Sequence, residues 1–267
     1  MYQSPNAPTT VNVENPIAVM QRKELKYILD QRQTEELRRR LAGHMQVDQF
    51  GRISIASLYY DTPDRRLIRT SVEGLPFKEK IRLRSYGLAT ESSPVFLELK
   101  RKAQGVVYKR RVRTTIPRAE GFFRRENEAG AGGQIDRELT YFRDFYRDLV
   151  PSCLIIYDRT AYFTPEGDLR LTIDEAPRYR TEQLELTRSM EGSPLLSSGG
   201  AILEIKAQGA MPLWLAEALS AGGICKTSFS KYGEAYRREI TKTRTERNAV
   251  LCLTPSLSIP SPRPCFS

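Results

Sequence analysis

The chain has 267 residues, of which 28% are charged and 40% hydrophobic, and its formal net charge at pH 7 is +10. This composition is typical of a soluble globular protein with one large domain or two small ones, and the positive charge favours anionic partners: nucleotides, other phosphate polyanions, nucleic acid or an anionic membrane surface. The single histidine, His44, excludes sites that need two histidines, and the sequence also lacks a Walker P-loop and a GxGxxG dinucleotide motif.

The first half of the chain is predicted to contain five strands and two helices. Residues 1–15 are polar and contain prolines, so they are predicted to form a flexible N-terminal arm. Hydrophobic periodicity and capping residues then predict, in chain order, a strand over 22–29, a helix over 30–43 capped by Asp30, a strand over 53–60, a short helix carrying Leu67 and Ile68, and strands over 77–86, 95–102 and 106–116.

The second half begins with a loop over 126–134 that is rich in glycine and alanine. The predicted elements that follow are a helix over 139–149, strands over 153–164 and 168–175 joined by a hairpin turn at 165–168, a strand over 201–207, a helix over 212–219 and a last helix over 231–240. Residues 242–267 become rich in serine and proline and are predicted to be a disordered tail.

Together these elements indicate an α+β fold on a mainly antiparallel sheet, because the predicted strands are joined partly by hairpins and the helices are scattered along the chain. The helices over 30–43, 139–149 and 212–219 are expected to cover the apolar strand faces. The charged faces then either meet solvent on an open sheet or line the inside of a closed barrel, and periodicity alone does not separate these arrangements.

The cysteines and the chain ends predict a cytoplasmic protein. None of the four cysteines forms a CxxC pair or a zinc-ligand spacing, so we expect reduced thiols, with Cys153 and Cys225 as small core residues. Residues 1–20 do not resemble a signal peptide, and no apolar run approaches the roughly 20 residues that span a bilayer.

Charged side chains share one strand face in five short stretches: 81–84, 96–100, 109–113, 169–174 and 202–206. Arg82 and Arg84 would lie about 6–7 Å apart on such a face. At that distance two cations repel by roughly 2–3 kcal/mol at an effective dielectric near 20. Because the pattern recurs, we interpret it as a polyanion-binding surface, although a solvated strand face, or for 109–113 an edge that discourages aggregation, would look the same.

Eight short motifs carry a resemblance to a known family. They occur in this order: Arg22-x-Glu24-x-Lys26-Tyr27, Leu58-Tyr59-Tyr60-Asp61-Thr62, Arg82-x-Arg84-x-Tyr86-Gly87, Glu98-x-Lys100, Tyr157-x-Arg159-Thr160-Ala161, Arg170-x-Thr172-x-Asp174, Leu203-Glu204-Ile205-Lys206 and Phe229-Ser230-Lys231-Tyr232. Together they resemble the VTC (vacuolar transporter chaperone) polyphosphate polymerase domain, which belongs with the CYTH proteins to the triphosphate tunnel metalloenzymes. The resemblance covers about residues 20–240, so 16–241 is expected to be one tunnel domain.

The resemblance implies an eight-stranded antiparallel β-barrel whose basic lumen holds ATP or another triphosphate beside a divalent metal, Mn²⁺ or Mg²⁺. A polymerase passes the γ-phosphate of ATP to a growing polyphosphate chain, whereas a triphosphatase passes it to water. The implied catalytic residues are Arg82, Arg84, Lys100, Arg159, Arg170 and Lys231. The implied substrate-binding residues are Lys26, Lys109, Arg111, Tyr157, Ser230, Lys206 and Lys226, and the implied metal ligand is Glu204.

Two positions depart from the family pattern. Arg22 replaces the first glutamate of the ExExK motif of CYTH proteins, which removes a metal ligand and favours a polymerase over a triphosphatase. Lys226 lies farther from Ser230 than the lysine of the closing motif, with Thr227 and Ser228 in the gap, so its role stays open. The family name also suggests a membrane-protein partner, which would place the cytoplasmic protein at a membrane surface.

A third alternative is a module that binds polyphosphate or RNA without catalysis. RNA readers stack bases on exposed aromatic side chains, and here the strand aromatics do not interleave with the arginines, so no specific nucleic acid is expected. Among the remaining polar residues, Glu98 is expected to form an ion pair and Asp174 to orient an arginine. Tyr59, Tyr60 and Trp214 are expected to be core residues.

Overall fold

The structure, a computed structural model, describes residues 23–130 and 132–253. The predicted arm over 1–15, Arg22 and residues 254–267 of the predicted tail lie outside these ranges. None of the helices in the described ranges is both long enough and apolar enough to cross a bilayer.

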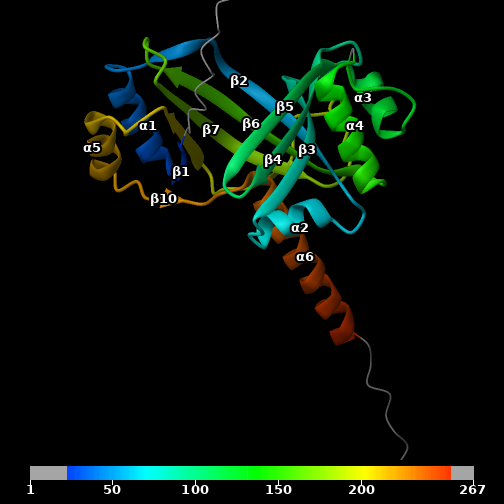
Figure 1. Ribbon diagram of the computed structural model, residues 1–267. Helices are drawn as coiled ribbons and strands as arrows, with labels where there is room; N and C mark the ends of the chain where they lie inside the picture. The colour runs from blue at the N-terminus through cyan, green and yellow to red at the C-terminus, as the bar shows by residue number, and fades with distance from the viewer. Residues whose placement is uncertain (1–22, 131, 254–267) are drawn as a thin grey trace, which may run out of the picture.

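One twisted antiparallel sheet forms the centre of the molecule (Figure 1). Its neighbours follow the order β10-β1-β9-β7-β6-β2-β3-β4-β5, and the short β8 pairs with β7. The strands are β1 (Lys23–Leu29), β2 (Gln46–Asp61), β3 (Phe77–Tyr86), β4 (Val95–Ala103), β5 (Val106–Thr114), β6 (Val150–Phe163), β7 (Leu169–Arg180), β8 (Ser193–Pro194), β9 (Ala201–Ala207) and β10 (Lys226–Thr227).

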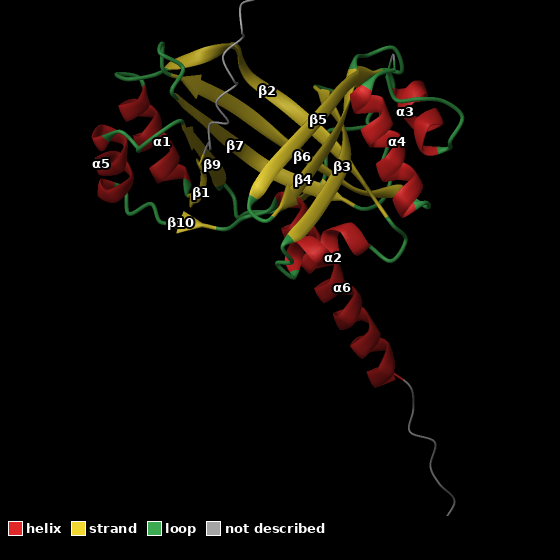
Figure 2. Cartoon of the chain, viewed as in Figure 1, coloured by secondary structure: helices red, strands yellow, loops and turns green. Residues whose placement is uncertain are grey.

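The helices lie around this sheet in three groups (Figure 2). They are α1 (Gln31–Leu41), α2 (Arg66–Val72), α3 (Ile116–Phe123), α4 (Gln134–Tyr146), α5 (Leu213–Ala221) and α6 (Lys231–Leu253). Buried side chains of α1 and α5 pack on β1, β7 and β9, and those of α3 and α4 pack on β2, β3, β4 and β6. The helices α2 and α6 pack on the opposite face of β2 and β6, so they close one end of its hollow side.

Side-chain alternation explains how one strand serves both faces. In β3, Ile81 and Leu83 are almost fully buried in the outer core, while Lys80, Arg82 and Arg84 point to the hollow side. The sheet curves around that side with the help of register shifts in the β2–β6 and β6–β7 pairs. The apolar set therefore fixes where the charged set must point.

Several sequence predictions are confirmed at the level of single contacts. Asp30 caps α1 through a capping box, because its side chain accepts from the Gln33 backbone at 2.7 Å and the Gln33 side chain accepts from the Asp30 backbone at 3.0 Å. The turn at 165–168 joins β6 and β7 with Gly167 at a positive φ of 75°. The α+β class and the antiparallel tunnel fold are also confirmed.

The predicted closed barrel needs a correction. Eight long strands are present in the described ranges, but β5 pairs only with β4, so no hydrogen-bonded contact joins the two ends of the sheet there. Other differences concern lengths: β2 begins at Gln46, β7 extends to Arg180, and α3 was not predicted. The helix α6 continues to Leu253, into the segment 242–267 that the sequence assigned to a tail.

Candidate functional site

A cavity of about 370 Å³ lies on the hollow side of the sheet. Its lining contains nine cationic side chains and three carboxylates, an excess of six positive charges. The cations come from six strands and the first turn of α6: Lys26, Lys80, Arg82, Arg84, Lys100, Lys109, Arg159, Lys206 and Lys231. Such a concentration of positive charge in a concave site attracts polyanions.

The strands β3, β4 and β5 form the more positive wall of this cavity. Their register places Lys80 opposite Lys100 and Lys100 opposite Lys109, so three ammonium groups form a transverse row. Neither Lys80 nor Lys100 has a carboxylate within ion-pair distance among the described residues. This row is therefore the part of the lining where positive charge is least compensated.

Glu98 is the only carboxylate that this wall contributes to the lining among the described residues, and its side chain is 2% exposed. Arg82 contacts it at 2.7 Å, Lys109 at 3.0 Å, Arg111 at 3.4 Å and Arg84 at 3.8 Å. Burial raises the pKa of Glu98, but Arg82, Arg84 and Lys109 outweigh burial and hold the pKa at about 2. Glu98 thus stays ionised and forms the ion pair that the sequence predicted.

The facing wall, from β1, β6, β7, β9 and α6, contains three carboxylates. Asp174 is fully buried and accepts two hydrogen bonds from the Arg159 guanidinium, at 2.6 and 2.7 Å, and one from Lys231. Burial raises the pKa of Asp174, yet Lys231 and Arg159 bring the net shift downwards. The prediction that Asp174 orients an arginine is confirmed by this paired contact.

Glu204 and Glu24 complete the facing wall around Lys26. The Lys26 ammonium lies 3.2 Å from Glu204 and 3.3 Å from Glu24, and Lys206 lies 3.8 Å from Glu24. Burial raises the pKa of Glu204, but Lys231, Lys26 and Arg159 lower it far more, so the carboxylate is ionised. Burial alone would lower the pKa of Lys26, and the two glutamates reverse that shift.

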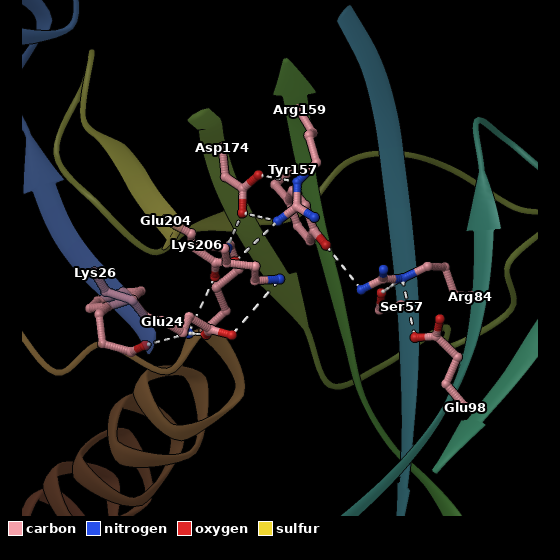
Figure 3. A network of polar contacts seen from close by, with 12 residues as sticks. Glu24, Lys26, Ser57, Arg84, Glu98, Tyr157, Arg159, Asp174, Glu204 and Lys206 are labelled. Carbon is pink, nitrogen blue, oxygen red and sulfur yellow. Dashed lines mark hydrogen bonds and ion pairs between the residues drawn. The ribbon is translucent and has the colours of Figure 1, made fainter. Parts of the chain in front are cut away.

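Tyr157 connects the two walls of the cavity, because its hydroxyl meets Arg84 of the positive wall (Figure 3). The Tyr157 hydroxyl accepts from Arg84 at 3.1 Å, and the Lys231 ammonium lies 4.5 Å from the centre of the same ring. The Tyr59 hydroxyl accepts from Arg82 at 2.9 Å. Tyr59 is buried, as predicted, but it also faces the cavity, so it is more than a packing residue.

The start of α6 is anchored by a buried aspartate. Asp61 accepts from the backbone of Leu67 and Ile68 at the start of α2, at 2.8 and 3.0 Å, and from the Tyr232 hydroxyl at 2.9 Å. Tyr232 follows Lys231 directly, and its ring stacks on Tyr59 at 4.4 Å. These contacts fix the backbone that presents Ser230 and Lys231 to the cavity.

Most of the residues predicted from the sequence meet in this cavity. Those that line it are Lys26, Arg82, Arg84, Lys100, Lys109, Tyr157, Arg159, Glu204, Lys206, Ser230 and Lys231. Arg111 lies just outside the lining and reaches Glu98, while its guanidinium carbon lies 3.7 Å from the centre of the Phe96 ring. The sequence therefore located eleven of the lining residues, drawn from segments far apart in the chain.

Two predicted ligands lie elsewhere. Arg170 is opposite Lys206 in register but beyond the cavity, where its side chain is 62% exposed and lies 3.7 Å from Asp48. Lys226 is opposite Tyr27, a buried residue of the outer core, so it shares the outer face of the sheet rather than the cavity face. Neither position brings the side chain to the cavity lining, so the structure does not group these two predicted ligands with the others.

Lys80 is the clearest lining residue that the sequence prediction missed. Its ammonium donates to the Ser230 hydroxyl at 3.2 Å. Burial, followed by repulsion from Lys100, Lys26 and Arg82, lowers the pKa of Lys80 to about 8. A signal was present in the sequence, because Lys80 continues the alternation of Arg82 and Arg84 by one more step.

Glu204, with Glu24 beside it, is the position in the cavity that best fits a divalent cation. Ionised carboxylate oxygens suit Mg²⁺ or Mn²⁺, and one or two of them suffice when substrate phosphates and water supply the remaining ligands. The described residues contain no cluster of three or more metal-ligating side chains. A metal would therefore depend on the bound phosphates and would compete with Lys26 for Glu204.

Comparisons with solved structures find similar chains at low sequence identity. A putative adenylate cyclase from Bacillus halodurans aligns at 13% identity over 78% of this chain and 92% of its own, with a TM-score of 0.50. A putative adenylyl cyclase from Hippeastrum, described as having a dominant triphosphatase activity, aligns at 16% identity over 78% and 92%, with a TM-score of 0.45. One from Vibrio parahaemolyticus aligns at 13% identity over 80% and 97%, with a TM-score of 0.44.

Comparison with curated proteins gives no match. The family comparison is more specific, since residues 21–239 match the VTC domain. That range contains every residue of the cavity lining, from Glu24 in β1 to Tyr232 in α6. The chain therefore belongs to the VTC domain family, as its motifs indicate.

Proposed function

We propose that this protein is a metal-dependent polyphosphate polymerase that transfers the γ-phosphate of ATP to a growing polyphosphate chain. The single observation that carries the proposal is the cavity in which nine cations converge on three carboxylates. Phosphoryl transfer needs positioning and charge neutralisation more than a covalent protein nucleophile. Arginine forks and lysine ammonium groups provide both for a chain of phosphates.

The proposed role of each cation follows from how far neighbouring carboxylates balance its charge. Arg82, Arg84 and the row of Lys80, Lys100 and Lys109 carry charge that Glu98 alone does not balance, so they would bind the phosphates. Arg159 and Lys231 are held by Asp174 and would keep fixed positions against the transferred group. A triphosphate would thus lie between a positive wall and a rigid, nearly neutral one.

The state of the carboxylates supports a phosphate acceptor over water. Glu98, Asp174 and Glu204 each contact at least two cations, and the net shift of each pKa is downwards, so none is suited to take a proton from water near neutral pH. The terminal phosphate of a polyphosphate chain is already anionic and needs no such base. This favours the polymerase over a triphosphatase of the same tunnel class.

A divalent ion would neutralise phosphate charge beside the basic residues. Glu204 would hold Mn²⁺ or Mg²⁺ as its principal protein ligand, and Glu24, which shares the partner Lys26 with Glu204, would be a second carboxylate for it. Held there, the ion would supply electrostatic neutralisation of the phosphate oxygens. Lys26, released from Glu204, would then be available to a phosphate oxygen.

Incubation of the purified protein with ATP and Mn²⁺ tests the proposal. The expected product resists nuclease and is degraded by an exopolyphosphatase, and it is absent without the metal. A Lys100→Ala variant should lose most of this product, whereas Arg137→Ala, which changes an exposed arginine on α4, should not.

Two other outcomes would lead to different functions. Orthophosphate alone, with no polymer, would indicate an inorganic or nucleoside triphosphatase. Tight polyphosphate or RNA binding without turnover, unaffected by Glu204→Ala, would indicate a non-catalytic binding module. A cytoplasmic location and a membrane-protein partner that receives the product are further proposals, and fractionation of tagged protein from cells would test both.

A further inference from the structure

A second pocket lies behind the strand pair that carries Arg82 and Arg84. Alternation in β2 and β3 turns Leu58, Tyr60 and Leu83 away from the phosphate cavity, and these side chains line a pocket of about 500 Å³. Leu58 and Leu83 are directly opposite each other in register. One two-stranded wall thus separates a basic cavity from an apolar pocket.

The remaining sides of this second pocket are also mainly apolar. The helix α3 contributes Ile116, Pro117 and Phe123, and a loop before β8 contributes Leu184 and Leu186. A pocket of this size, lined by aliphatic and aromatic side chains, is typical of sites for small organic ligands. Its volume suits a body of one aromatic ring with a short aliphatic chain.

Carboxylates around the second pocket select the charge of its ligand. Glu91, Glu120 and Glu185 line it together with Arg124, which lies 3.6 Å from Glu120 and 2.8 Å from Glu126 and is therefore compensated. Among the described residues no cation lies within ion-pair distance of Glu91 or Glu185. Arg180 lies near Glu185, because its guanidinium donates to the Glu185 backbone carbonyl at 3.0 Å, but it forms no ion pair with the carboxylate. In a protein with a net charge of +10, two carboxylates without an ion pair mark a local preference for a cation.

We propose that this second pocket binds a small amphiphilic amine, with its apolar body against Leu58 and Leu83 and its ammonium group beside Glu91 and Glu185. The complementarity is the reverse of that in the phosphate cavity, whose excess of lysine and arginine would repel the same amine. The binding of the amine does not depend on the proposed polymerase activity.

Calorimetric titration with two ligands of equal shape tests this site. We use 4-phenylbutylamine, which is charged at pH 7, and 4-phenylbutan-1-ol, which has the same apolar body without the charge. The purified protein should bind the amine about fivefold more tightly than the alcohol, since an ion pair at a partly exposed mouth contributes up to about 1 kcal/mol. Equal affinities, or no binding of the amine, would overturn the proposal.

Two variants locate the binding. Glu91→Gln with Glu185→Gln should abolish the preference for the amine and leave the alcohol affinity unchanged. The matched control, Glu73→Gln with Glu166→Gln, changes net charge equally at exposed positions outside the pocket and should keep the preference. A preference that persists in the first variant would refute the site.

A third variant tests the apolar body of the ligand. Leu184→Trp should fill the pocket and remove binding of both ligands, with thermal melting as the check of folding. Binding that persists in a folded Leu184→Trp protein would place the ligand elsewhere. If this variant does not fold, the glutamine pair still decides the proposal, because it leaves the apolar lining untouched.

Discussion

The two walls of the phosphate cavity contain similar residues but balance their charges differently. On the β3–β5 wall six cations share one carboxylate, Glu98; they are Lys80, Arg82, Arg84, Lys100, Lys109 and Arg111. On the facing wall four cations share three carboxylates; the cations are Lys26, Arg159, Lys206 and Lys231, and the carboxylates are Glu24, Asp174 and Glu204. The first wall therefore has an excess of positive charge that an anionic ligand can balance. The charges of the second wall are nearly balanced without a ligand.

Strand register causes this difference. On the facing wall a cation is opposite a carboxylate at three pairs: Lys26 with Glu204, Lys206 with Glu24, and Arg159 with Asp174. On the β3–β5 wall Lys80, Lys100 and Lys109 are opposite one another, and directly opposed like charges destabilise a sheet. A bound polyanion would relieve this repulsion, so under the proposed function the wall would give up some stability in exchange for phosphate affinity.

The largest expected effect comes from removing the arginines of the positive wall. Arg82→Ala with Arg84→Ala should weaken tripolyphosphate binding by at least about 100-fold, because charge-assisted hydrogen bonds contribute roughly 1.5–3 kcal/mol each. Calorimetric titration measures the loss, and circular dichroism checks that the fold remains. Loss of folding in this variant would make the pair structural instead.

A matched pair on the outer surface serves as the control for that experiment. Arg110→Ala with Arg137→Ala removes the same two charges away from the cavity, where Arg110 contacts Glu138 at 2.8 Å and Arg137 is exposed. In this control the tripolyphosphate affinity should fall only slightly, because the two lost charges act on the ligand only at long range. A loss as large as that of the cavity pair would mean that binding follows total charge rather than the site.

Removal of the Glu98 carboxylate tests how much it stabilises the positive charges of the same wall. Glu98→Gln leaves Arg82, Arg84, Lys109 and Arg111 without their shared carboxylate, so the free energy of unfolding at pH 7 should fall by about 3 kcal/mol. Tripolyphosphate should raise the melting temperature of this variant by more than it raises that of the wild type. Glu138→Gln, an outer-surface control, should show no such extra restoration.

The pH dependence of Glu98 has a definite direction. Its pKa of about 2 in the folded protein lies below its ordinary value of 4.5, because the surrounding cations outweigh burial. Its stabilising contribution is complete above pH 4.5 and is lost as the pH falls from 4.5 towards 2. Denaturant titrations across this window should show a steeper loss of stability for the wild type than for Glu98→Gln; parallel curves would contradict the assignment.

The facing wall should respond to metal rather than to net charge. Glu204→Gln should reduce by about tenfold the gain in tripolyphosphate affinity that Mn²⁺ produces, because the main protein ligand for the ion is lost. Affinity without metal should not fall, because loss of the carboxylate frees Lys26 and removes a negative charge from the cavity. Glu175→Gln is the control, since Glu175 is also partly buried and contacts Arg38 at 2.6 Å, outside the cavity. An unchanged Mn²⁺ effect in Glu204→Gln would exclude the proposed ligand.

Much of the fold and of the site could be predicted because alternation is local. The apolar residues of β3 determine which side its basic residues face, and this holds whatever the partner strands are. Whether the sheet closes is not local: it depends on how β5 and β1 meet after eight strands of twist and several bulges. Periodicity contains no information on that distance, so it left the open and closed arrangements undecided. The closed barrel came from the family resemblance, and in the described residues the sheet does not close.

Local features also explain why two predicted ligands, Arg170 and Lys226, lie outside the cavity lining. Arg170 was assigned from its motif and does face the correct side, but strand length carries it beyond the cavity to Asp48. Lys226 belongs to a two-residue strand whose facing is set by pairing with Tyr27, which only the fold reveals. Lys80, by contrast, was within reach of the alternation argument and was missed because the basic stretch was taken to begin at Ile81.

Lys80 also provides the smallest and most selective test of the positive wall. Its pKa of about 8 lies below the ordinary 10.5, because of burial and then the neighbouring cations, so stability should rise as the pH goes from 8 to 10.5. A bound phosphate would favour the charged ammonium and raise this pKa. Tripolyphosphate affinity should therefore fall above pH 8, by up to about tenfold per pH unit for one linked proton.

Replacement by arginine separates this effect from titration of the ligand. Lys80→Arg stays charged throughout this pH range. Between pH 8 and 9.5 its tripolyphosphate affinity should therefore decline less than that of the wild type in the same buffers. Lys100→Arg changes the next lysine of the same row and leaves Lys80 in place, so it should keep the wild-type pH profile. Identical profiles for all three proteins would mean that Lys80 is charged before the phosphate arrives, and that the wall does not store the repulsion inferred from its register.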